Sequence, residues 1–99
     1  MKLQKTAMAG TLESSDAQVT IEPGEGGIRL ELTSSVMSQF GRQIREVVLE
    51  TLARLEITDA NVIVNDKGAL NCTLKARVEA AAFRAAGQQE GIPWGGAVR

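Results

Sequence analysis

Two stretches of strict alternation between apolar and polar residues constrain the fold of this chain most. Val19 and Ile21 alternate with polar neighbours across residues 17–22, and the same two-residue period returns across residues 28–33. A period of two places every second side chain on one face, so each stretch predicts a half-buried strand. The glycine-rich segment 23–27 separates the two stretches, and we expect it to form the turn of a β-hairpin.

The period then changes to that of an amphipathic helix over residues 36–56. Its apolar stripe consists of Met37, Phe40, Ile44, Val47, Val48, Thr51 and Leu55. Ser34 and Ser35 precede the stripe as N-cap candidates. Glu50 and Arg54 have the i,i+4 spacing that favours an ion pair on the polar side.

The rest of the chain predicts one more strand and one more helix. The β-branched residues 62–64 indicate a short strand, and residues 65–68 carry a strong turn signal. A further short strand over 69–72 is an open alternative. From Thr73 the helical period returns and ends at Gly87, a candidate C′ glycine. The predicted stripe of this second helix is Leu74, Val78, Ala81, Ala82 and Ala85.

These elements predict an α+β fold. We expect a small two-layer sandwich, in which two helices pack on one face of a mostly antiparallel sheet, in the order β-β-α-β-(β)-α. The length of 99 residues predicts a single domain over 1–99. Residues 1–16 are expected to form a flexible, exposed segment or loop, and 88–99 a flexible tail. In that tail, Trp94 either anchors a partner or packs back on its own domain.

Composition excludes several classes of function. Histidine is absent, which removes Ser-His-Asp catalysis, histidine metal ligands and imidazole bases. The 11 basic and 12 acidic residues give a net charge of −1, so no basic field predicts nucleic acid or membrane binding. The lone Cys72 excludes an internal disulfide and is expected to be a small buried hydrophobe. No leader or membrane span is predicted, and we expect a soluble, cytoplasmic protein without a metal site.

The acidic segment near residue 14 is the main candidate for chemistry. Glu13 and Asp16 are a possible acid–base pair, but an exposed loop would leave their pKa values ordinary, which favours a solvated acidic turn. Ser14 and Ser15 have no activating base, so neither is predicted to be a nucleophile. A loop hydroxyl can instead be esterified by another enzyme, although a plain loop serine is the more frequent case.

The same segment carries a resemblance to a known family. Ala9-Gly10-Thr11-Leu12-Glu13-Ser14-Ser15-Asp16 resembles the N-terminal signature of citrate lyase acyl carrier proteins, the gamma subunits. Further matching residues follow in order along nearly the whole chain. They are Ser34-Ser35-Val36, Gln39-Phe40-Gly41, Ile44-Arg45, Leu52-Ala53-Arg54, Asp66-Lys67-Gly68-Ala69-Leu70, Cys72, Leu74, Ala76-Arg77, Glu79-Ala80 and Pro93-Trp94.

The resemblance implies a carrier that catalyses nothing itself. It places a covalent 2'-(5''-phosphoribosyl)-3'-dephospho-CoA on Ser14 through a phosphodiester, with Glu13 and Asp16 as recognition context for the prosthetic-group transferase. The thiol of this group would carry acetyl and citryl thioesters. The implied partners are the alpha (transferase) and beta (lyase) subunits of citrate lyase, which convert citrate to acetate and oxaloacetate.

Three alternatives stay open at this stage. A carrier subunit of malonate decarboxylase is similar in size and uses the same type of group. An unmodified protein-interaction module and a small enzyme using Glu13 and Asp16 belong to other classes. The residue types alone do not separate Ser14 from Ser15 as the attachment point.

Overall fold

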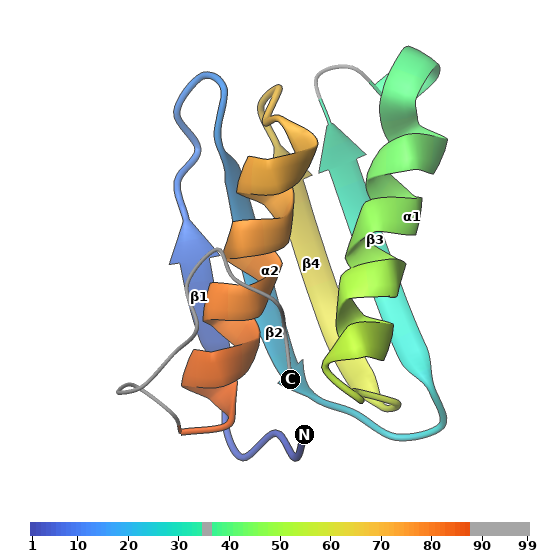
Figure 1. Cartoon of the computed structure of the whole chain (residues 1–99), viewed down its shortest axis with the longest axis vertical. Coiled ribbons are helices and arrows are strands. Elements are labelled where there is room, and N and C mark those ends of the chain that lie inside the picture. The colour runs from blue at the N-terminus through green and yellow to red at the C-terminus, as the bar shows by residue number, and fades with distance from the viewer. Residues whose placement is uncertain (35–36, 88–99) are drawn as a thin grey trace.

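The computed structural model describes residues 1–34 and 37–87, which form four strands and two helices. The elements are β1 (Ala7–Gly10), β2 (Ala17–Pro23), β3 (Ile28–Ser34), α1 (Met37–Arg54), β4 (Ala60–Asp66) and α2 (Asn71–Ala85). The strands make one mixed sheet in the order β1-β2-β4-β3, and both helices lie on the same face of it (Figure 1). The predicted α+β class, with two helices on one face, is confirmed.

The predicted hairpin between β2 and β3 is wrong, because β4 lies between them. β4 pairs antiparallel with β2 and parallel with β3. Alternation shows which face of a strand is buried but not which strand is its neighbour. Helix α1 supplies the long crossover that parallel β3 and β4 require. Residues 24–27 need to span only two strand spacings, about 10 Å, which four residues reach easily.

The core lies between the sheet and the two helices. Ala17, Val19 and Ile21 of β2 and every second residue of β4 are buried there, and the helices contribute one face each. On α1 the buried side chains include Ile44, Val48, Thr51 and Leu52, with Leu55 buried just after the helix ends, and on α2 they include Leu74, Val78, Ala81, Ala82 and Ala85. The predicted stripes are therefore confirmed where they are described. The side chains of Met37 and Phe40, and Ser35 as a cap, lie outside the described residues.

Strand β1 falls inside residues 1–16, which the sequence predicted as an exposed segment or loop. It pairs antiparallel with β2 along Ala7–Gly10 and buries Ala9. The amides of Gln4 and Lys5 donate to Ala85 O at 2.8 and 3.1 Å. An alanine-rich strand without β-branched residues gives little strand signal, and only its pairing with β2 reveals it.

The further short strand that the sequence left open over residues 69–72 does not form. Helix α2 begins at Asn71, two residues before the predicted start at Thr73. Cys72 therefore lies on the first turn of a helix and is exposed, which corrects its predicted burial. Gly68 has the predicted left-handed backbone with φ +92°. Gly87, at φ +83°, ends α2 as predicted, and its amide donates to Arg84 O at 3.0 Å. Among the described helices, neither is long and apolar enough to cross a membrane.

Glu79 is a carboxylate buried on α2, and Lys75 Nζ lies 3.9 Å from its Oε1. Burial raises the pKa of Glu79, against the smaller, opposing effects of the Lys75 and Arg54 charges. A raised native pKa means that the folded state holds its proton more tightly than the unfolded chain. The contribution of Glu79 to the free energy of unfolding is therefore complete below its ordinary pKa of 4.5. This contribution is lost as the pH rises through the higher pKa of the folded state.

We expect Glu79→Gln to raise the melting temperature at pH 8, with the gain shrinking toward pH 4.5, the ordinary pKa. Thermal unfolding of the variant and wild type across this range measures the difference. Glu50→Gln is the control, because Glu50 lies on the exposed side of α1, where it pairs with Arg54 at 2.7 Å. A gain for Glu79→Gln that is absent, or equal at all pH values, contradicts the expectation.

Candidate functional site

The segment with the candidate serines connects β1 to β2 at one end of the sheet. The connection between β4 and α2 lies at the same end (Figure 1). Residues 13–16 form a turn in which the Asp16 amide donates to Glu13 O at 3.2 Å. Ser14 and Ser15 occupy the middle of this turn, and both are exposed. The turn therefore presents two hydroxyl-bearing side chains to solvent.

Gly10 allows the chain to leave β1 and enter this loop. Its φ is +86°, and a Cβ built on it would lie 1.8 Å from Ala17 O in the neighbouring strand. That separation is far inside van der Waals contact, and the clashing atom belongs to the backbone. Only glycine therefore fits where β1 meets the loop.

Gly10→Ala is expected to destabilise the fold by about 3 kcal/mol or more, since it combines a left-handed backbone with a backbone clash. Gly26→Ala is the matched control. Gly26 has a similar φ of +79° but has no atom within 4 Å of its Cβ position. Gly26→Ala should lower the free energy of unfolding only by the cost of placing alanine in a left-handed backbone conformation, about 1–2 kcal/mol. Chemical denaturation of both variants measures the difference, and equal losses would contradict the role of the clash.

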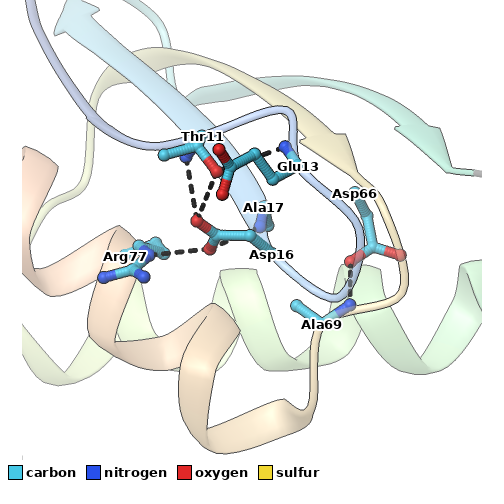
Figure 2. Close-up of polar contacts among 7 residues, drawn as sticks. All are labelled: Thr11, Glu13, Asp16, Ala17, Asp66, Ala69 and Arg77. Atoms are coloured by element: carbon cyan, nitrogen blue, oxygen red, sulfur yellow. Dashed lines mark hydrogen bonds and ion pairs between the residues drawn. The ribbon is translucent and has the colours of Figure 1, made fainter.

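Asp16 organises the loop through its carboxylate (Figure 2). Its Oδ2 accepts the Thr11 hydroxyl at 2.7 Å and the Thr11 amide at 3.1 Å. Its Oδ1 accepts the Ala17 amide at 2.7 Å and Arg77 Nε at 2.9 Å. Thr11 Oγ1 in turn accepts the Glu13 amide at 3.2 Å. One side chain thus ties both ends of the serine loop to helix α2.

These contacts correct the prediction that Asp16 is a solvated carboxylate with an ordinary pKa. The hydrogen bond from Arg77, and then the one from the Thr11 hydroxyl, hold the pKa of Asp16 well below its usual range. A carboxylate stabilised in this way is a poor proton acceptor. The geometry therefore gives no support to an acid–base pair of Glu13 and Asp16. Glu13 itself is exposed, as predicted.

The backbone beyond the turn is fixed to the β4–α2 connection. Lys67 N donates to Asp16 O, and Ser15 N donates to Lys67 O, both at 2.8 Å. The first bond continues the β2–β4 pairing one step past Ala17 and Asp66. Ser15 takes a left-handed backbone with φ +67° to make these contacts. Ser14 therefore projects from a loop whose flanks are held in place.

The β4–α2 connection is held by a second aspartate. Asp66 is buried and accepts Ser34 Oγ at 2.8 Å, the Gly68 amide at 3.2 Å and the Ala69 amide at 3.0 Å (Figure 2 shows the last of these). Ser34, one of the two predicted cap residues, ends β3, and its hydroxyl bonds to this carboxylate. Asp66 thus joins the end of β3 to the start of α2.

An open groove lies between α1 and the β4–α2 connection, with a volume of about 440 Å³. The residues that line it are Gln43, Ile44, Asp66, Gly68, Ala69, Leu70 and Asn71. Leu70 is 72% exposed, the largest exposed fraction among the described large apolar residues. No local sequence pattern predicts this groove, because its walls come from segments far apart in the chain.

Among residues 1–34 and 37–87, no three histidine, cysteine, aspartate or glutamate side chains gather as metal ligands would. Trp94 and the rest of the tail lie outside the described residues. The serine loop and the adjacent groove are thus the features of this end of the sheet on which a function can be built.

Comparisons with known proteins place this geometry in context. A family model described as "ACP: Malonate decarboxylase delta subunit (MdcD)" matches residues 4–85. Citrate lyase acyl carrier protein 2 of Salmonella typhimurium is 60% identical over 95 residues, covering 95% of this chain and 97% of the relative. Citrate lyase acyl carrier protein of Oenococcus oeni is 51% identical over 94 residues, with the same coverage.

A solved structure matches the fold. It is a chain in the crystal structure of a Pseudomonas malonate decarboxylase hetero-tetramer in complex with malonate. The TM-score is 0.59 with 20% sequence identity, and the match covers 83% of this chain and 84% of that chain. At this identity, the likeness extends to the fold alone.

Proposed function

We propose, from the premise that this chain belongs to the family of citrate lyase acyl carrier proteins, that it is the acyl carrier subunit of citrate lyase and is modified on Ser14. The proposed modification is a phosphoribosyl-dephospho-CoA joined to the serine through a phosphodiester. When bound, this group supplies a thiol on a long arm, which can hold an acyl group as a thioester. The chain itself is a carrier and not a catalyst.

The observation that carries this proposal is the setting of Ser14. Its side chain is exposed at the middle of a turn, so a modifying enzyme can reach its hydroxyl. Before Ser14 the loop is held by the bonds from Thr11 to Asp16, and after it by the bonds of Ser15 to Lys67 and of Arg77 to Asp16. A bulky group can therefore be attached at the turn without displacing a buried residue.

The side chains around the turn fit a phosphodiester. Arg77 uses Nε on Asp16 while its side chain remains 38% exposed, and Lys67 is exposed in the neighbouring connection. Both cations favour a negatively charged group nearby. In this setting, Asp16 serves to position the loop and Glu13 remains available for recognition by the prosthetic-group transferase.

The choice of Ser14 over Ser15 rests on the family signature, in which the modified serine follows Leu12-Glu13. Exposure does not separate the two residues, because both are exposed. Their backbones do differ, since Ser15 has its amide bonded to Lys67 O and Ser14 is one residue further from that contact.

We infer that the partners are the alpha and beta subunits of citrate lyase. The identities of 51–60% to citrate lyase carriers support this choice over malonate decarboxylase, where the structural match is 20% identical. The chain has no histidine, so any imidazole-based catalysis in the complex would come from the larger subunits. The cytoplasm is the compartment where we expect the complex to act.

Intact mass spectrometry tests the proposal directly. The chain is produced with and without the enzymes that build and attach the prosthetic group. We expect one phosphoribosyl-dephospho-CoA to be added only in their presence, and fragmentation should locate it on Ser14. An unchanged mass with active maturation enzymes would instead favour an unmodified interaction module. Modification by a malonate decarboxylase maturation system, and not by that of citrate lyase, would redirect the assignment.

A further inference from the structure

We propose that the groove between α1 and the β4–α2 connection receives the neutral, thiol-bearing part of the arm carried on Ser14. This inference rests on the proposed function and adds a resting place for the arm on the carrier itself. The arm would then not hang freely in solvent between its visits to the larger subunits. Four observations support this proposal. They are the short distance from Ser14 to the groove, the residues that line the groove, the charges around it and the open space beside Gly68.

The groove begins very close to the proposed attachment point. Ser15 N donates to Lys67 O at 2.8 Å, and the next residue, Gly68, lines the groove. Standard bond lengths added to this hydrogen bond place Ser14 Cα within about 8 Å of the Gly68 nitrogen. An arm that starts at Ser14 therefore reaches the groove without any movement of the backbone.

The lining matches the chemistry of the arm. The thiol-bearing part of a dephospho-CoA is a chain of methylene groups interrupted by two amides. Ile44, Ala69 and Leu70 supply apolar surface, while Gln43 and Asn71 carry side-chain amides that can pair with amides of the arm. The volume of about 440 Å³ lies in the range of small-molecule sites.

The charges of the protein differ between the places where the phosphates and the uncharged end of the arm would lie. Among the described residues that line the groove there is no lysine or arginine, and Asp66 is its charged member. A phosphate would be repelled there. Lys67, in the β4–α2 connection, contacts the serine loop through its backbone, and Arg77 contacts the loop through Asp16. The phosphates therefore stay beside the loop, and the uncharged portion lies along the groove.

Open space remains on the wall nearest the serine. A Cβ placed on Gly68 would meet no atom within 4 Å. Asp66 fixes the backbone of this wall through the Gly68 and Ala69 amides, so the wall is present before any ligand arrives. A preformed site binds with less loss of conformational freedom than one that has to be ordered.

Amide NMR spectra of the unmodified and modified full-length chain test this proposal. We expect the signals of Gln43, Ile44 and residues 68–71 to shift on modification, beyond those of the serine loop. The outer sheet face, which includes Ile63, should not change. A second measurement follows the arm thiol with a thiol-reactive dye in a Cys72→Ser background, which removes the exposed cysteine.

The arm thiol should react at least about threefold more slowly than free pantetheine, as expected if two thirds or more of the arms are docked. Leu70→Asn should restore the fast rate by removing apolar surface from the groove. Ile63→Asn is the control, because Ile63 is an apolar residue 43% exposed on the opposite face of the sheet. It should leave the slow rate unchanged.

The outcomes separate this inference from the proposed function. A chain that gains the full mass, but shows no groove shifts and a fast thiol, overturns the docking and leaves the carrier function intact. Groove signals that shift only when the larger subunits are added make the groove a partner-binding surface, which also overturns it. A chain that never gains mass overturns both proposals.

Discussion

Ser14→Ala is expected to abolish attachment of the prosthetic group and, with it, the activity of reconstituted citrate lyase. The loss should exceed about 1,000-fold, because covalent tethering replaces an encounter in solution and effective molarities of well-oriented groups reach about 10⁵ M or more. The substitution removes one exposed oxygen and no described hydrogen bond. Intact mass and the rate of citrate cleavage with the alpha and beta subunits measure the two effects.

Ser15→Ala is the matched control for this experiment. Both serines are exposed in the same turn, and alanine keeps the Cβ that Ser15 already carries at φ +67°. Its folding stability should change by less than about 0.5 kcal/mol, as for most exposed sites. The Ser15 variant should keep the added mass and the activity. If Ser15→Ala lost the added mass and Ser14→Ala kept it, the attachment point would be Ser15. Full activity of both variants would contradict a carrier that works through this turn.

Periodicity predicted the elements that have strong patterns of their own. The alternation over 17–22 and 28–33 became β2 and β3, and the stripe of 36–56 became α1. What periodicity could not give was pairing. A hairpin and a crossover bury the same faces of β2 and β3, and the choice depends on where β4 inserts. β1 was missed because its four residues, Ala7–Gly10, become a strand only beside β2.

At the candidate site, too, local features could be predicted from the sequence but long-range contacts could not. A short local motif was enough to single out Ser14 and its acidic neighbours. The role of Asp16 depends on Arg77, which lies 61 residues further along the chain, and no local pattern connects them. The groove lining is likewise drawn from α1 and from the start of α2. The sequence was therefore enough to propose Ser14 as a candidate, whereas the contacts that hold its loop could be found only in the tertiary structure.

Asp16→Asn is expected to loosen the serine loop and to destabilise the fold. The asparagine amide nitrogen cannot accept hydrogen bonds, so the variant loses either the two Thr11 donors or the Arg77 and Ala17 donors. We expect a loss of about 3 kcal/mol or more, since two hydrogen bonds to the carboxylate are lost and hydrogen bonds to charged groups contribute about 1.5–3 kcal/mol each. This corresponds to a drop of roughly 10 °C or more in melting temperature for a chain of this size.

The pH dependence of stability gives this prediction a second readout. The native pKa of Asp16 lies below its ordinary value of 3.8, mainly because of the hydrogen bond from Arg77. The stability that it contributes is therefore fully present above the ordinary value. It is lost as the pH falls from there toward the lower native value. Wild type should lose stability in this acid range, and Asp16→Asn should lack that part of the loss.

A double-mutant cycle shows whether Asp16 and Arg77 act as a unit. Arg77→Gln alone should cost about 1–2 kcal/mol, and the double variant should cost at least about 0.5 kcal/mol less than the two single losses together. Arg84→Gln is the control, since Arg84 lies on the same helix and donates to Met8 O of β1 at 2.8 Å, away from Asp16. Both loop variants should also be modified more slowly on Ser14, because a mobile turn presents the hydroxyl less often in a productive position. Additive losses, with a normal modification rate, would mean that the Asp16–Arg77 pair does not position the serine.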